Sequence, residues 1–177
     1  ASLQNKGKVS FVTKEPKRWG IPIKPLPKTY TDRVLVVGDA AGFVKPTSGG
    51  GIYYAMLSGE IAAEASHRAL MSDDLVGNQL REYESMWKTT FGRELKVGSN
   101  ARYLYETLRD DQIEYLLDGF LARDTQQQLI SSGDVSFDWH SKLILRVIAH
   151  KKLSKVIRSF GPVVAPFLLR MTGSGLG

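Results

Sequence analysis

The first part of the chain carries short apolar runs separated by turn-forming residues. Residues 8–13, KVSFVT, alternate apolar and polar side chains and predict a short strand. Residues 20–28 contain three prolines, a spacing that excludes a helix or an inner strand and predicts an extended connector. Residues 34–37 are a continuous run of valine and leucine, which is typical of a strand covered on both faces, and the run ends at Gly38.

A long helix is predicted after a glycine-rich loop at residues 42–51. Residues 52–70 have the spacing of a helix of about five turns. Small side chains recur every four residues along two lines of this helix, so its backbone can lie close to a neighbouring element. The two lines are Ala55, Gly59 and Ala63, and Ser58, Ala62 and Ser66.

From about residue 72 onward, the apolar spacing is that of helices. Leu80, Tyr83, Trp87 and Phe91 share one helical face, which predicts a stripe buried in a core. Gly98 and the serine after it predict a break in this helical stretch. Further helices are expected at residues 101–109, 111–122, 124–131, 138–150 and 152–160.

Composition narrows the classes to which the protein can belong. Hydrophobic residues make up 42% of the 177 positions, which suits one ordinary core. The chain has no cysteine, which excludes disulfides, thiolate zinc sites and cysteine nucleophiles. Its three histidines are too scattered to predict a metal site. Because neither an apolar run of 18 residues nor a signal peptide is present, we expect a cytoplasmic protein.

Charge is distributed unevenly along the chain. Residues 1–30 carry seven Lys or Arg and one Glu, and residues 140–177 carry seven Lys or Arg and no acid. Two basic ends suit contact with an anionic partner, although solvated faces produce the same pattern. Lys142 and Arg146 lie opposite the apolar stripe of their predicted helix, so residues 142–170 predict either peripheral contact with an anionic membrane or a capping helix.

The chemically informative stretch is residues 33–59, RVLVVGDAAGFVKPTSGGGIYYAMLSG. A buried strand delivers Gly38 and Asp39 to the end of a sheet at which α/β folds bind ligands. A carboxylate at this position accepts hydrogen bonds from hydroxyl groups, such as those of a ribityl chain. Ala40 is small enough for a ligand to approach the backbone closely.

The loop and the helix after it add further binding features. Pro46 stiffens the loop, and residues 49–51 are glycines that adopt conformations barred to other residues. The helix that begins at Ile52 presents free N–H groups and the positive end of its dipole. A group that gains negative charge, such as a reduced flavin pyrimidine, would be stabilised there by about 1.5–3 kcal/mol per charge-assisted hydrogen bond.

Other side chains near this stretch have ordinary interpretations. We expect Lys45 to be a solvated lysine, although it could favour an anionic reduced flavin. One of Tyr53 and Tyr54 is expected to pack into the sheet, and the other could line a ligand site. Trp19 is expected to take part in ordinary packing.

The pattern strand–GDAAG–x(3)–P–x(2)–GGGI–helix–SG resembles the second flavin-binding motif of the hydroxylase-like FAD enzymes. Within that group, PTSGGGIYYAMLSG is most similar to the geranylgeranyl reductase family, a resemblance that covers residues 20–70 well. It implies an α/β fold to which this chain contributes the final strand–loop–helix of a Rossmann-like FAD-binding domain and then a mainly helical C-terminal region. The corresponding divisions are residues 1–30 (end of the substrate-domain sheet and return connector), 31–72 (second FAD-contacting motif) and 73–177 (helical region).

The resemblance also implies a site and a reaction. FAD would be bound by Gly38, Asp39, Ala40, Pro46, Gly49, Gly50, Gly51 and Ile52. The expected reaction is reduction of C=C bonds in a geranylgeranyl chain on a prenyl lipid or a prenylated pigment precursor, with electrons from an external donor, either NAD(P)H or a ferredoxin-like protein. The family's GxGxxG turn is not found here, so we expect the chain alone to be inactive and its catalytic residues to lie upstream.

Two other interpretations stay open. One is a quinone-linked electron-transfer flavoprotein dehydrogenase or a monooxygenase-like FAD enzyme. A hydroxylase usually has His after GDAA, where this chain has Gly42, and the chain lacks cysteine ligands for an iron–sulfur cluster. The other is a non-enzymatic basic module that binds a membrane surface or nucleic acid. No recognition helix, zinc finger or aromatic RNA platform is apparent, so no nucleic-acid partner is expected.

Overall fold

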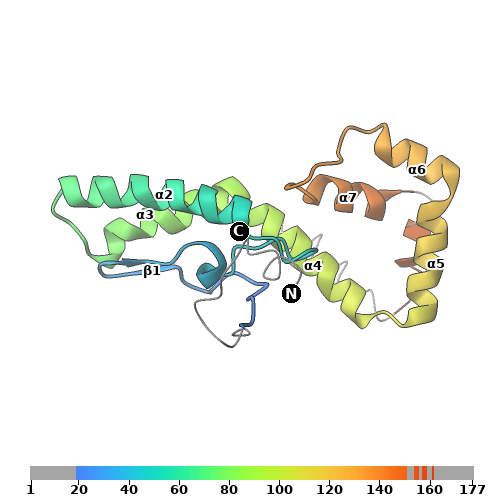
Figure 1. Cartoon of the computed structure of the whole chain (residues 1–177), viewed down its shortest axis with the longest axis horizontal. Coiled ribbons are helices and arrows are strands. Elements are labelled where there is room, and N and C mark those ends of the chain that lie inside the picture. Colours follow the sequence, from blue (N-terminus) through green and yellow to red (C-terminus); the bar gives the residue numbers. More distant parts are fainter. Residues whose placement is uncertain (1–18, 151–153, 156, 159–160, 162–177) are drawn as a thin grey trace, which may run out of the picture.

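The computed structural model describes residues 19–150, 154, 155, 157, 158 and 161. Figure 1 shows an elongated molecule, with the strands, α2 and α3 at one end and α5, α6 and α7 at the other. Helix α4 (Arg93–Thr107) runs between the two ends. The predicted strand at residues 8–13 lies outside the described residues.

A short antiparallel hairpin is the only sheet within the described residues. Strand β1 (Tyr30–Thr31) pairs with β2 (Val34–Leu35), and Tyr30 lies opposite Leu35. The connector before the hairpin forms neither helix nor strand, as its prolines predict. The expectation of a strand over residues 34–37 covered on both faces is wrong for this structure, since Val34 is 47% and Val37 is 38% exposed. One side of the segment packs against helices, and no further described strand covers the other side.

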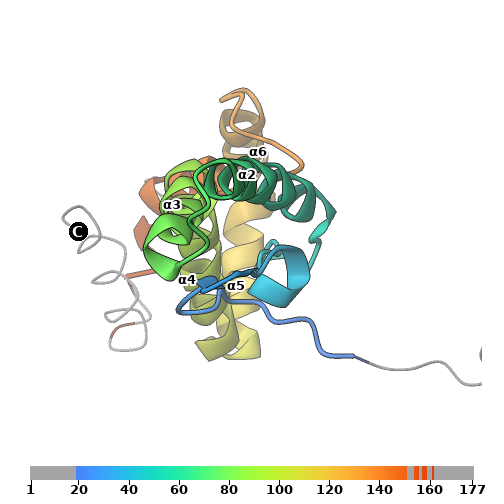
Figure 2. The ribbon, with the colours of Figure 1, turned by 90° about the vertical axis from the view of Figure 1, so that its left-hand side faces the viewer.

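A turn of 3-10 helix, η1 (Gly38–Ala41), follows the hairpin, and α2 (Ile52–Met71) then begins within one residue of its predicted start. Figure 2, which looks at this end of the molecule, shows α2 and α3 (Gly77–Trp87) lying together above the hairpin. In the line of small residues Ser58, Ala62 and Ser66, the first two are buried and Ser66 is half-buried, whereas a Cβ added to Gly59 would meet open space.

The three segments from residue 77 to residue 107 form one helical rod. A five-residue π-helix, η2 (Lys88–Gly92), joins α3 to α4 without leaving helical backbone angles. The predicted break at Gly98 is therefore wrong. Gly98 lies within α4, and Pro46 packs directly against it. A glycine suits this helical position because a Cβ on residue 98 would lie 3.0 Å from Pro46 Cδ.

The remaining helices are α5 (Asp110–Leu121), α6 (Arg123–Ile130) and α7 (Ser141–Ala149), close to the predicted ranges. Of the helix predicted at residues 152–160, only Ser154, Lys155, Ile157 and Arg158 are described, and these four are helical. The described chain is thus mainly helical with a two-stranded sheet, and a Rossmann-like sheet stays an expectation for a larger protein.

An aromatic cluster forms the core at the hairpin end. The ring of Phe43 lies 4.7 Å from that of Trp87 and 5.1 Å from that of Phe91, and Tyr54 lies 5.4 Å from Phe91. The predicted stripe on α3 is confirmed, because Leu80, Tyr83, Trp87 and Phe91 are each at most 3% exposed. Rings of this size bury the largest apolar area per side chain, so this cluster carries most of the packing energy at this end.

Polar groups on α3 hold the connector and hairpin in place. The Tyr83 hydroxyl donates to the Val36 carbonyl (2.8 Å), and Trp87 Nε1 donates to Thr29 Oγ1 (2.8 Å). Glu84 accepts from the backbone N–H of Thr29 (2.9 Å). Burial alone would raise the pKa of Glu84, but hydrogen bonds from Lys88 and Thr29 outweigh it and hold this pKa below its usual value.

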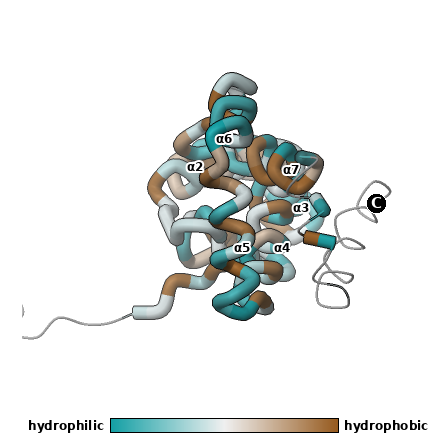
Figure 3. The backbone as a smooth tube through the Cα atoms, turned by 90° about the vertical axis from the view of Figure 1, so that its right-hand side faces the viewer, coloured by the Kyte–Doolittle hydropathy of each residue, from teal (hydrophilic) through white to brown (hydrophobic). Residues whose placement is uncertain are grey.

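A second, smaller core lies at the other end of the molecule. Leu104 of α4 and Ile157 are buried there, with Leu108, Leu116 and Ile148 packed around them. Between α4, α5 and α7 these side chains leave a hollow of about 320 Å³. Figure 3, viewed from this end, shows the apolar colour concentrated on α7. The half-buried residues of α7, Leu143, Ile144, Val147 and Ile148, line this hollow.

Two helical glycines give opposite predictions. We expect Gly59→Ala to raise the free energy of unfolding by about 0.5–1 kcal/mol, because Ala favours a helix and the added Cβ meets open space. We expect Gly98→Ala to lower it by about 1 kcal/mol, because the rigid ring of Pro46 cannot give way. Urea denaturation of the two variants checks both signs, and equal shifts would contradict the Gly98–Pro46 contact.

Candidate functional site

The GDAAG turn is positioned by close backbone contacts. Gly38 has a φ of 57° and donates its N–H to Ser58 Oγ of α2 (3.1 Å). Gly42 has a φ of 75°, and a Cβ on it would collide with the carbonyl oxygen of Lys24. Only glycine satisfies both the backbone angle and the space at residue 42, which is a structural reason why no His stands there.

Backbone hydrogen bonds close the glycine-rich loop on itself. The N–H of Lys45 donates to the Gly50 carbonyl (2.9 Å), and the N–H of Gly49 donates to the Lys45 carbonyl (2.7 Å). Gly49 has a φ of 76°, a conformation that suits glycine. These hydrogen bonds fix the conformation of the loop that leads into α2.

The loop brings Asp39 to the beginning of α2. The carboxylate of Asp39 lies so close to the N-cap residue Gly51 that a Cβ there would overlap its Oδ1 atom. No side chain caps the N-terminus of α2, and Ile52 at its first position is 82% exposed. Among the described residues, none donates a hydrogen bond to the exposed Asp39 carboxylate. Within the described part of the chain, an exposed acceptor and backbone donors without a side-chain cap thus stand side by side.

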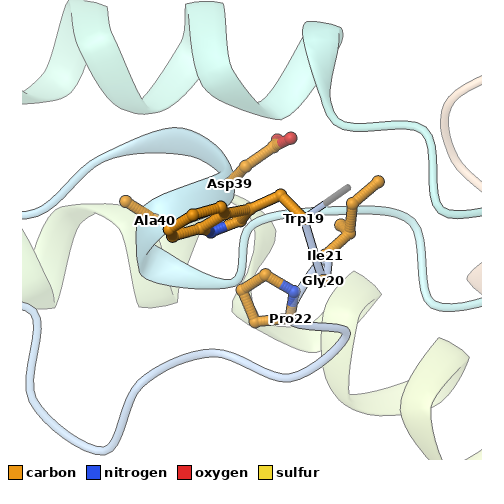
Figure 4. A pocket seen from close by; sticks show the side chains of 6 residues that line it. All are labelled: Trp19, Gly20, Ile21, Pro22, Asp39 and Ala40. Atoms are coloured by element: carbon orange, nitrogen blue, oxygen red, sulfur yellow. The ribbon is translucent and has the colours of Figure 1, made fainter. Parts of the chain in front are cut away.

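An open hollow of about 740 Å³ adjoins this carboxylate. We call it the Asp39 hollow, and it is lined by Trp19, Gly20, Ile21, Pro22, Asp39 and Ala40. Figure 4 shows the Asp39 carboxylate and the Trp19 indole on the same hollow. Its walls are apolar apart from the carboxylate, so it suits a ligand with a flat apolar part and hydroxyl groups.

Lys45 is not the solvated lysine that the sequence suggested. It is 7% exposed, and its Nζ atom donates to Asp138 Oδ1 and to the Phe137 carbonyl, both at 3.0 Å. The same ammonium lies 4.1 Å from the centre of the Phe137 ring. The loop lysine therefore binds the segment before α7 instead of facing a ligand, because the chain brings that segment back across the loop.

Two further contacts join the loop and α2 to the same segment, and Glu94 joins α4 to it. Thr47 Oγ1 is hydrogen-bonded to His140 Nδ1 (2.8 Å), and the Tyr54 hydroxyl donates to the Asp138 carbonyl (2.7 Å). The buried Glu94 carboxylate accepts from the backbone N–H groups of His140 (2.5 Å) and Ser141 (2.8 Å), which caps the N-terminus of α7. Sequence reasoning missed Glu94, since its partners lie more than 40 positions away.

The two tyrosines after the loop have different surroundings. Tyr54 is fully buried, and burial, with Glu94 and Asp138 nearby, raises the pKa of its hydroxyl. It packs against Phe91 of the helical rod rather than into a sheet. Tyr53 is half-buried and meets Trp139 edge to face at 5.8 Å. Neither ring lines the Asp39 hollow.

The predicted site residues fall into two groups. Gly38, Asp39, Ala40, Gly51 and Ile52 gather around the turn and the beginning of α2. Pro46 instead packs on Gly98 of α4, and its carbonyl accepts a hydrogen bond from Arg102 (3.1 Å). Gly49 and Gly50 shape the loop between these groups. The cofactor-binding roles assigned to all eight residues stay predictions.

Neither a metal site nor a membrane-spanning helix is present among the described residues. No group of three or more His, Asp or Glu side chains among them is placed to hold a metal ion. None of the helices in this part of the chain is both long enough and apolar enough to cross a membrane.

The Lys45 contacts predict an asymmetric effect of two lysine substitutions. Lys45→Met should lower the free energy of unfolding by about 1–3 kcal/mol, because Asp138 and the Phe137 carbonyl lose a buried charged donor. Lys96→Met, on the exposed face of α4, should cost less than about 0.5 kcal/mol. Urea denaturation measures both, and hydrogen exchange should show the loss of protection at residues 137–149. Equally small losses of unfolding free energy in the two variants would contradict a stabilising role of the Lys45 contacts with Phe137 and Asp138.

Comparison with known proteins identifies relatives of the chain. No family model matches the chain. An uncharacterized protein of Methanocaldococcus jannaschii is 37% identical over 128 residues, which is 72% of this chain and 32% of that protein. The digeranylgeranylglycerophospholipid reductase of the same organism is 43% identical over 98 residues, covering 55% of this chain and 25% of the reductase.

A solved structure agrees with these relatives. The crystal structure of a geranylgeranyl bacteriochlorophyll reductase-like protein from Thermoplasma acidophilum is 28% identical, with a TM-score of 0.59, and the match covers 79% of this chain and 32% of that one. The chain thus spans a third or less of the length of these relatives. The relatives of the chain thus include digeranylgeranylglycerophospholipid reductases and a geranylgeranyl bacteriochlorophyll reductase-like structure, and the partial coverage fits the C-terminal portion of such a protein.

Proposed function

We propose that the complete protein containing this chain is an FAD-dependent oxidoreductase that reduces C=C bonds of a geranylgeranyl chain on a lipid. The observation that carries the proposal is the exposed Asp39 carboxylate held against the N-terminus of α2, which no side chain caps. Relatives named digeranylgeranylglycerophospholipid reductase support the substrate class. Because the chain spans at most about a third of these relatives, the activity is proposed for the whole protein.

The residues at the turn fit a flavin. The Asp39 carboxylate is exposed and available to accept hydrogen bonds from ribityl hydroxyls. The first N–H groups of α2, from Ile52 onward, have no side-chain cap and can donate to an electron-rich ring edge. The Asp39 hollow, of about 740 Å³, lies beside both groups.

In this proposal the chain supplies binding and electrostatics. FAD, when bound, supplies the hydride chemistry. Backbone donors at the beginning of α2 stabilise negative charge on the bound ring, and the glycines of the loop allow the close approach that such bonds need. We assign no acid or base to the described residues. Electrons would come from NAD(P)H or a ferredoxin-like donor.

Peripheral membrane contact through residues 142–170 is part of the proposal. The apolar side of α7 faces the hollow between α4 and α5, so this helix would meet a membrane with its other side. Lys142 and Arg146 are exposed, and Arg146 is paired with Asp134. Such cations suit anionic headgroups. Most of residues 151–170 lie outside the described residues.

Removal of the Asp39 carboxylate should weaken flavin binding specifically. We expect Asp39→Ala in the complete protein to weaken FAD binding by about 1–3 kcal/mol, because ribityl hydroxyls lose a charged acceptor. Asp118→Ala, at an exposed position of α5, is the matched control and should leave the affinity unchanged. Titration of the apoprotein with FAD measures both. An unaltered affinity in the Asp39 variant would refute the role assigned to this carboxylate.

The visible absorption spectrum of the purified complete protein tests the proposal itself. A yellow protein that releases FAD on denaturation, and that reduces a geranylgeranyl lipid when supplied with a donor, is the expected result. A colourless protein that cannot be reconstituted with FAD would refute the proposal.

A further inference from the structure

The largest exposed aromatic surface near the candidate site belongs to Trp19. Its side chain is 92% exposed, although the sequence suggested ordinary packing, and Ile21 two residues later is 53% exposed. An indole has one of the largest apolar surfaces among side chains, so leaving it in water forgoes the stabilisation that burial would give. An exposed aromatic on the wall of a hollow is accordingly typical of a ligand contact.

The segment that carries Trp19 is held against the GDAAG turn. The N–H of Leu26 donates to the Ala41 carbonyl (3.0 Å). The Lys24 carbonyl lies directly over Gly42, where no side chain could be accommodated. Residues 24–26 therefore lie in direct contact with the GDAAG turn. These contacts bring the connector next to the turn, and residues 19–22 of the connector line the hollow together with Asp39 and Ala40.

The lining of the hollow has two chemical parts. Trp19, Ile21 and Pro22 give it an apolar wall, and Asp39 gives it a carboxylate. The other two lining residues, Gly20 and Ala40, have little or no side chain, and an added Cβ on Gly20 would meet nothing within 4 Å. A ligand that joins a planar ring to a hydroxyl-bearing chain matches this division, with the ring on the indole and the hydroxyls at the carboxylate.

We propose that the indole of Trp19 stacks against the isoalloxazine ring of the flavin whose ribityl chain Asp39 holds. This inference rests on the proposed function, because it names a further contact of the same cofactor. The ribityl chain is bonded directly to the isoalloxazine, so the ring lies within a few bonds of Asp39, on the hollow that both residues line. Trp19 is thus a cofactor-binding residue that supplies a face for the ring.

The test compares three variants of the complete protein. Trp19→Leu keeps an apolar side chain and removes the aromatic ring, Trp19→Phe keeps a smaller ring, and Tyr115→Leu removes an aromatic that is 57% exposed on α5. An indole in contact with a flavin quenches its fluorescence by electron transfer. We expect the bound-flavin fluorescence to rise several-fold in Trp19→Leu and its Kd for FAD to rise about three- to tenfold. Trp19→Phe should recover most of the affinity, and Tyr115→Leu should match the parent.

Each outcome decides between the alternatives. Unchanged flavin fluorescence in Trp19→Leu, in a protein that still binds FAD with the parent affinity, would overturn the stacking contact and leave the proposed function intact. A higher Kd for FAD with unchanged flavin fluorescence would indicate that the indole contacts the adenine ring. That result would also overturn the proposed stacking on the isoalloxazine. If the parent protein binds no FAD, the proposed function itself fails. If Trp19→Leu does not fold, Trp19→Phe still tests the proposal, since its weaker electron donor should raise the fluorescence.

Discussion

Burial of Phe43 among the rings of Tyr54, Trp87 and Phe91 is the interaction on which the site depends. Phe43 stands four residues after Asp39, and its ring is fully buried between side chains of α2, α3 and the π-helical segment. Because the ring cannot shift without opening the core, the short turn before it is held as well. The exposed Asp39 carboxylate at the beginning of α2 is therefore positioned by the apolar packing of Phe43 and not by an ion pair with another described residue.

Local pattern predicted the features whose causes are local. The helix from Ile52, the α3 stripe of Tyr83 and Trp87 and the glycine-rich loop all follow from periodicity and residue type. The contacts of Lys45 and Glu94 were missed because their partners lie 93 and 46 positions away, and nothing near either residue indicates a buried partner. Gly98 was misread as a break for the same reason, since its cause is the distant Pro46.

The exposed side chains fit a protein of which this chain is one part. Ile52 and Met56, on successive turns of α2, are 82% and 72% exposed, and the edge of β2 away from β1 has no partner among the described residues. Apolar side chains and unpaired strand edges in such positions favour contact with further protein. Coverage of residues 34–37 on both faces would need elements that the described residues do not supply.

The π-helical segment also determines the rotational phase of the rod. An i→i+5 turn holds one residue more than an α-turn, so it rotates every later side chain by about 100° about the axis. With this offset, Phe91 faces the aromatic cluster while Leu104 faces the second core. Deletion of one residue within Lys88–Gly92 would restore a regular helix and leave Leu104 facing the second core, because the π turn already absorbs one extra residue. The π-helical turn thus accommodates one extra residue in a continuous helix whose two ends contribute to different cores.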